Sequence, residues 1–120
     1  MKRFILILHL FFCVSCTSDY DESLGNGYFF VATNKNNHYI VKNDRMIVGS
    51  NVSKYKMFGI YTVGYREKPT KPDTNVGSSE KYGYFILNIS DGLLVEGLSK
   101  DAYLRKIEQF GIAEARVLSK

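Results

Sequence analysis

The hydrophobic and polar positions in the first half of the chain alternate in the way that is typical of β-strands. Residues 27–33 are rich in aromatic and β-branched side chains and are followed by a polar turn cluster. Residues 38–42 and 45–48 flank Asn43 and Asp44, two residues that tolerate positive φ and therefore suit a tight turn. The pattern predicts one strand followed by a β-hairpin.

Three further strands and one long loop are predicted in the second half of the chain. Residues 55–66 alternate with apolar side chains on both faces, which indicates a single central strand that is covered on both sides, on one of them by a helix. Residues 67–81 contain both prolines and almost no hydrophobic side chains, so they predict a loop. Residues 82–89 form the strongest predicted strand, and a turn leads from them into a strand at residues 93–97.

After residue 98 the hydrophobic period becomes that of a helix. Ser99 is placed as an N-cap, and residues 100–110 carry an apolar stripe at helical spacing. Gly111 can end this helix in the left-handed conformation, so that Ile112 packs back onto Ile107 in a Schellman motif. The stripe that we expect to cover a sheet consists of Tyr103, Leu104, Ile107 and Phe110.

Together these elements predict an α+β fold, in which an antiparallel sheet of about five or six strands in meander order carries one packed C-terminal helix. We expect residues 27–120 to form a single domain, since about one hundred residues is the commonest domain size. A domain of this size buries about two thirds of the surface of its unfolded chain, so it can fold without disulfides or a structural metal.

Residues 1–15 have the parts of a secretion signal. Lys2 and Arg3 form a charged start, residues 4–14 are apolar, and a small residue precedes Cys16. An apolar stretch of about a dozen residues is too short for a transmembrane helix, which needs about twenty. We therefore predict a signal peptide, and the alternative is a buried N-terminal helix of the domain.

Both cysteines of the chain, Cys13 and Cys16, lie at the end of this signal, which excludes a disulfide framework in the exported domain. Residues 14–16, Val-Ser-Cys, resemble the lipobox of bacterial lipoproteins, in which the cysteine thiol receives diacylglycerol before the signal peptidase cuts in front of it. Lipoboxes carry Leu, Val or Ile three residues before the cysteine, and here that place is Cys13. The resemblance implies lipidation of Cys16 and a cell-envelope location, anchored in a membrane and facing the periplasm or the exterior. Ordinary signal cleavage, which releases a soluble secreted protein, is the alternative.

Residues 16–26 are polar and acidic, and we interpret them as a short tether between the lipid and the domain. Asp19, Asp21 and Glu22 raise the alternative of a metal site. Tight calcium loops need more ligands and a fixed turn, so a flexible linker is the favoured interpretation.

The formal net charge of +4 gives little reason to expect anionic partners. Lys2 and Arg3 belong to the signal, which leaves 14 of the 16 basic residues against 12 acidic ones and a net charge of +2. Nucleic-acid-binding proteins usually carry a clustered basic surface, and this chain has no long basic run. We expect no nucleic-acid partner.

Recognisable catalytic and metal-binding motifs are missing from the sequence, so we expect neither enzyme activity nor a cofactor. The exported part contains one histidine, His38, and no cysteine besides Cys16, which excludes a Cys–His nucleophile pair and a multi-histidine metal site within one chain. His38 lies beside a turn and is interpreted as an exposed surface residue. Carboxylates from remote segments can meet in a glycosidase-like pair, which keeps catalysis as a minor alternative.

Tyrosines on the predicted strands are open to two interpretations. A ring can pack on the sheet while its hydroxyl reaches water, and tyrosine-rich faces also serve as recognition surfaces. Because loops on rigid sheets carry function, we predict a partner-binding surface that includes Pro69, Pro72, Tyr65 and Tyr82. The predicted function is that of a non-catalytic, protein-binding module of the cell envelope. The alternatives are an immunity lipoprotein that neutralises a toxin delivered into the periplasm, and a structural or housekeeping lipoprotein without a dedicated partner.

Five segments of the chain are similar to a group of small, uncharacterised bacterial lipoproteins. The segments are residues 51–55, 84–88, 91–92, 96–99 and 107–112. The resemblance implies a β-rich domain with a C-terminal helix behind a lipidated cysteine. Its motifs are structural, and it implies no activity.

Overall fold

The computed structural model describes residues 20–33, 38–68 and 81–120. Within these ranges the chain forms eight strands, one α-helix and one 3-10 helix. In chain order they are β1 (Tyr20–Gly25), β2 (Tyr28–Ala32), β3 (His38–Lys42), β4 (Arg45–Val48), β5 (Val52–Phe58), β6 (Tyr61–Arg66), β7 (Gly83–Asn88), β8 (Leu94–Leu98), α2 (Lys100–Gln109) and η1 (Ala113–Ser119). The expected β-rich α+β fold with a C-terminal helix is confirmed.

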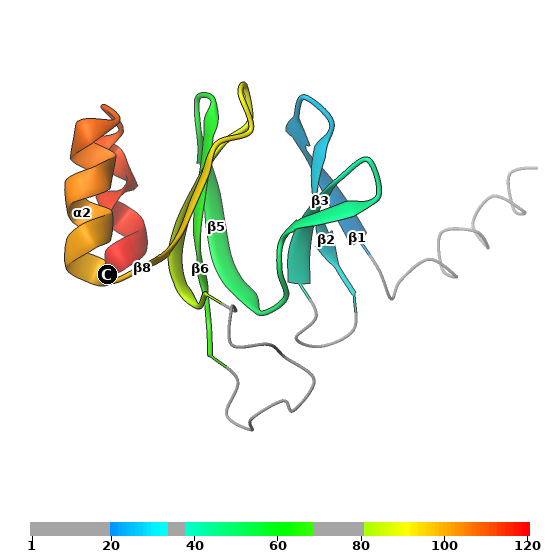
Figure 1. The fold of residues 1–120 in the computed structure, drawn as a ribbon, viewed down its shortest axis with the longest axis horizontal. Helices are drawn as coiled ribbons and strands as arrows, with labels where there is room; N and C mark the ends of the chain where they lie inside the picture. The colour runs from blue at the N-terminus through cyan, green and yellow to red at the C-terminus, as the bar shows by residue number, and fades with distance from the viewer. Residues whose placement is uncertain (1–19, 34–37, 69–80) are drawn as a thin grey trace, which may run out of the picture.

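The strands form two antiparallel sheets rather than one. Sheet A has the order β1-β2-β3-β4 and sheet B the order β5-β6-β7-β8, so each sheet is a meander, but the expected single sheet of five or six strands is wrong. The two sheets face each other, and α2 and η1 cover the other face of sheet B (Figure 1). The molecule therefore has three layers, with sheet B in the middle.

One reason for the error is that residues 55–66 are not one strand. They contain the end of β5, a turn at Gly59 and Ile60, and β6. Gly59 has φ of 63°, a conformation that glycine adopts readily. The turn pairs Phe58 with Tyr61, which puts these two side chains on the same face of sheet B, whereas a continuous strand would separate them.

A second reason lies in the segment that we interpreted as a tether. Residues 20–25 form β1, which pairs with β2, and Leu24 is buried between the sheets. Asn26 and Gly27 have φ of 53° and 85°, as an Asn-Gly hairpin turn requires. The folded part therefore includes residues 20–26, and a flexible linker is the wrong interpretation for Asp21 and Glu22.

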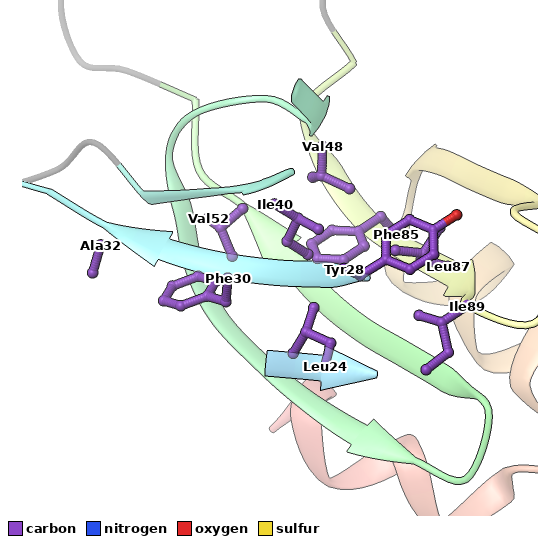
Figure 2. Packing of buried hydrophobic residues seen from close by; sticks show 10 residues of the cluster. All are labelled: Leu24, Tyr28, Phe30, Ala32, Ile40, Val48, Val52, Phe85, Leu87 and Ile89. Atoms are coloured by element: carbon purple, nitrogen blue, oxygen red, sulfur yellow. The ribbon is translucent and has the colours of Figure 1, made fainter. Parts of the chain in front are cut away.

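The space between the two sheets holds the first hydrophobic core (Figure 2). Phe85 and Leu87 of β7 are fully buried and point toward sheet A. The ring of Phe30 in β2 stacks on that of Tyr55 in β5, with centroids 4.1 Å apart. The ten buried members of this core are Leu24, Tyr28, Phe30, Ala32, Ile40, Val48, Val52, Phe85, Leu87 and Ile89.

A second core lies between sheet B and the helical layer. Tyr103 and Ile107 of α2 are fully buried, which confirms the predicted helical stripe. The other buried members of this core are Val63, Tyr84, Ile86, Ile112, Ala115 and Leu118. Neighbouring residues of β7 alternate between the two cores, so this strand is covered on both faces.

Both predicted ends of the helix are confirmed. The Ser99 side chain accepts a hydrogen bond from the backbone N–H of Ala102. Gly111 has φ of 76°, and the backbone N–H of Ile112 donates to the carbonyl oxygen of Ile107 at 2.8 Å, as in a Schellman motif. In the part of the chain that the structure describes, no helix has the length and apolar character needed to cross a membrane.

Candidate functional site

One row of side chains crosses all four strands of sheet B near the start of β7. The strand register pairs Lys54 with Tyr65, Tyr65 with Tyr84, and Tyr84 with Leu98. Tyr84 belongs to the core beneath the helical layer, and Tyr65 and Leu98 pack against that core. The row therefore lies on the face of sheet B that α2 and η1 cover.

The helical layer leaves part of this row open. Tyr103, in the second turn of α2, stacks on Tyr84 with ring centroids 4.5 Å apart, and Phe110 stacks on Tyr61 toward the opposite end of the strands. The helix thus runs away from the row along sheet B. An open groove of about 760 Å³ remains beside the N-cap Ser99 and the first helical residue, Lys100. We call it the tyrosine groove, because Tyr65, Tyr82 and Tyr84 all line it.

A β-bulge on each edge strand flanks the row. In β5 an extra residue, Ser53, stands between the pairs formed by Val52 and Lys54. In β8 the register also shifts next to Tyr84, and Gly97 has φ of 68° there. Bulges redirect the neighbouring side chains, and both Ser53 and Gly97 line the tyrosine groove.

The rings of the groove are held in a defined geometry. Tyr65 and Tyr84 meet edge to face, with centroids 4.7 Å apart and planes at 64°. The Lys54 ammonium lies 5.8 Å from the Tyr65 ring and 6.0 Å from the Tyr84 ring. The floor of the groove therefore consists of the Tyr65 and Tyr84 rings with the Lys54 ammonium beside them. The edge-to-face geometry stabilises the contact between the two rings, and the cation–π geometry stabilises the contact between the ammonium and the rings.

Arg66 positions the ring of Tyr82, the third tyrosine of the groove. Its guanidinium lies 4.8 Å from the centre of the Tyr82 ring, and its side chain is only 3% exposed. Arg66 Nε donates to the carbonyl oxygen of Ser50 at 2.9 Å and Nη1 donates to that of Lys81 at 3.4 Å. The guanidinium thus joins the β4–β5 connection to the residue that precedes Tyr82.

Burial and close packing change the acidity of two tyrosines at the groove floor. Burial raises the pKa of Tyr84, and the neighbouring Tyr65 raises it further. Burial also raises the pKa of Tyr103 to about 12, with Tyr84 as the second cause. The Tyr103 hydroxyl donates to the carbonyl oxygen of Ala115 at 2.7 Å. These phenols are neutral at physiological pH and act as hydrogen-bond and packing groups.

We expect the folded state to lose stability at alkaline pH as the buried Tyr103 hydroxyl ionises. The usual pKa of tyrosine is 10.0, and the folded state raises it to about 12, so the folded protein holds this proton more tightly than the unfolded chain does. The resulting stabilisation, about 2–3 kcal/mol, is fully present below about pH 10 and is lost as the pH rises through about 12. We expect the free energy of unfolding in urea to fall less steeply above pH 10 for Tyr103→Phe than for the wild type. Parallel curves would contradict this role of Tyr103.

Two of the predicted partner-binding residues, Tyr65 and Tyr82, come together in the tyrosine groove. Pro69, Pro72 and the predicted lipidation site Cys16 lie outside the described residues. The sequence analysis missed Lys54 and Arg66, and it counted Tyr84 among the strand tyrosines without placing it in the binding surface. The only local signal of Lys54 and Arg66 is a basic residue on an apolar strand, and strand register decides which side chains that residue contacts.

His38 is half-buried rather than fully exposed. Its ring meets the edge of the Phe30 ring, with centroids 5.8 Å apart and planes at 73°. Among residues 20–33, 38–68 and 81–120, no three histidine, cysteine or acidic side chains are grouped so that they could hold a metal ion. Comparison of the chain with protein-family models, with curated proteins and with solved structures gives no match.

Proposed function

We propose that the chain is an exported bacterial lipoprotein, anchored through Cys16, whose folded part binds a protein partner in the tyrosine groove and catalyses no reaction. The anchor is supported by the charged and apolar start of the chain and by the Val-Ser-Cys sequence at residues 14–16. The fold adds that β1 begins at Tyr20, four residues after Cys16. A lipid on Cys16 would thus hold the domain directly at the membrane.

The binding role rests on one observation, the open aromatic row at the end of sheet B. Tyr84 is 8% exposed and holds Tyr65 at a fixed angle, so the Tyr65 ring loses little freedom when a partner covers it. Rigid tyrosines contribute large contact areas at low cost in conformational entropy, which is why they are frequent in binding hot spots.

The remainder of the groove has the composition of an interface rim. Lys54, Glu67 and Lys100 contribute charges of both signs, and Ser53 and Ser99 contribute hydroxyl groups. Protein interfaces commonly surround an aromatic centre with such a polar rim. The wide opening beside the first turn of α2 suits a segment of another protein.

Alanine substitution of two groove tyrosines tests this role. The domain, purified as Tyr65→Ala/Tyr82→Ala and as the wild type, is used to capture partners from envelope extracts, and the affinity for the captured partner is then measured. Truncation of hot-spot residues costs about 2 kcal/mol or more, so we expect the affinity to fall by about 30-fold or more. Tyr39→Ala, which removes the same side chain from sheet A, is the matched control and should bind as the wild type does.

Equal affinity of the double variant and the wild type would contradict binding in the tyrosine groove. Capture of no partner by the intact domain would contradict the binding role itself. Replacing residues 69–79 with a Gly/Ser linker tests separately whether Pro69 and Pro72 take part. A toxin as the captured partner would identify the immunity form of the same role.

A further inference from the structure

The outer face of sheet A, which points away from sheet B, carries apolar side chains on β2, β3 and β4. Tyr28, Phe30 and Ile40 point into the core between the sheets, so the residues that alternate with them in β2 and β3 point outward. The strand register pairs Phe29 with Val41, Val31 with Tyr39, and Val41 with Met46. We call these five residues the outer patch: Phe29, Val31, Tyr39, Val41 and Met46.

Solvent reaches the outer patch. Phe29 is 40% exposed and Met46 is 57% exposed, and Val31, Tyr39 and Val41 are half-buried. On the adjoining edge strand, Ser23 pairs with Phe29 and Asp21 pairs with Val31. Large contiguous patches of exposed apolar side chains are typical of surfaces that contact another protein or a membrane.

The length of chain between the anchor and β1 indicates what that contact is. Four residue steps separate Cys16 from Tyr20, and an extended chain covers at most about 3.6 Å per step, so the start of β1 lies within about 14 Å of a lipid on Cys16. Phe29 pairs with Ser23, which lies three residues after Tyr20 in β1. The Phe29 row is therefore about 10 Å from the start of β1. This row thus lies within about 24 Å of a lipid on Cys16.

Sheet A contains the strand that follows Cys16 in the chain. β1 is its edge strand, and sheet B separates it from α2 and η1 (Figure 1). Because the lipid keeps the domain at the membrane, contact between sheet A and the bilayer is an intramolecular event that needs little affinity of its own.

We propose that the outer patch rests on the bilayer that holds the lipid of Cys16, with its aromatic and apolar side chains at the level of the headgroups. The proposal depends on the lipidation of Cys16 stated under the proposed function. Phe29 and Met46 enter the interface between headgroups and acyl chains, and Tyr39 keeps its hydroxyl among the headgroups, as interfacial tyrosines do. The tyrosine groove then faces away from the bilayer.

A single tryptophan reports this contact, because the chain contains none. The lipidated Phe29→Trp protein is reconstituted into phosphatidylethanolamine and phosphatidylglycerol vesicles, with and without brominated acyl chains. We expect its emission to shift to shorter wavelength and to be quenched by the brominated lipid. Val117→Trp, at a 50% exposed position of η1, is the matched control and should show neither change. Met46→Trp provides a second reporter in the same row, should Phe29→Trp fold poorly.

Flotation of the vesicles separates the outcomes. Protein that floats with the vesicles while the tryptophans at positions 29 and 46 stay unshifted and unquenched would overturn the bilayer contact and leave the anchor intact. A shifted emission without quenching by brominated lipid would show that a protein, such as a second copy, covers the outer patch, and this too would overturn the proposal. Protein that carries no lipid and does not float would overturn the anchor and the bilayer contact together.

Discussion

Replacing Phe85 with alanine is expected to lower the free energy of unfolding by about 3–5 kcal/mol. The Phe85 ring is fully buried between the two sheets, and Gly64 on the neighbouring strand leaves room for it. A β-carbon at Gly64 would come within 2.5 Å of the Phe85 ring and of the Lys54 carbonyl oxygen, so the ring fills the space next to the Gly64 backbone. Truncation therefore leaves a cavity at the centre of the first core. Urea denaturation of the soluble Cys16→Ser domain measures the change.

Phe29→Ala is the matched control for this prediction. It makes the same substitution at a 40% exposed position of sheet A, where we expect a loss of about 1 kcal/mol or less. Equal losses for Phe85→Ala and Phe29→Ala would contradict the packing of sheet A on sheet B through Phe85.

Ile107→Ala tests the second core in the same way. Ile107 is fully buried between α2 and sheet B, and we expect a loss of about 2–5 kcal/mol. Ile60→Ala, at a 48% exposed turn position, should change the free energy of unfolding by less than about 1 kcal/mol. If Ile107→Ala is as mild as Ile60→Ala, the helix does not rest on the sheet through this residue.

The helix and two hairpin strands could be predicted because their signals are local. Ser99 and Gly111 mark the two ends of α2 within a few residues of the stripe that they bracket. Asn43 and Asp44, with φ of 51° and 63°, form the tight turn expected between β3 and β4. Each of these features depends on contacts between residues that are close in the chain.

The division of the strands into two sheets could not be predicted. It depends on what covers each face of a buried strand, a second sheet or a helix, and the sequence does not show this. We predicted one strand covered on both faces at residues 55–66, whereas β6 and β7 share that role. Thr62 and Val63 of β6 are both buried, and in β7 Phe85 and Leu87 face sheet A while Tyr84 and Ile86 face the helical layer. Apolar side chains on both faces of a segment show that the segment is enclosed, without showing what encloses it. The Asn-Gly pair at positions 26 and 27 was the available signal for β1, and the acidic residues before it favoured a linker.

The candidate site could be predicted only in part, for a related reason. Tyr65 and Tyr82 lie on either side of the segment that connects β6 to β7, so a hairpin brings them close. Lys54 and Leu98 come from the edge strands, and a bulge next to each of them sets their place in the row. A bulge shifts register by one residue, and its position is decided by packing on both sides of the strand.

The two proposals assign different functions to two surfaces of the molecule, the outer face of sheet A and the tyrosine groove. Sheet A, which begins four residues after Cys16, would face the bilayer. The tyrosine groove, on the far side of sheet B next to α2, would then be open to a partner in the periplasm or at the cell exterior. The bilayer contact and the location of the groove both depend on the lipid at Cys16, whereas binding in the groove does not.

Cys16→Ser therefore tests the central claim most directly. The wild type and the variant are expressed in a bacterial host with a labelled fatty-acid analogue and are separated by detergent phase partition. We expect the wild type to carry the label and enter the detergent phase, and the variant to be unlabelled and to appear in the soluble periplasmic or extracellular fraction. A wild type without label, or a variant that stays with the membrane as the wild type does, would contradict an anchor at Cys16.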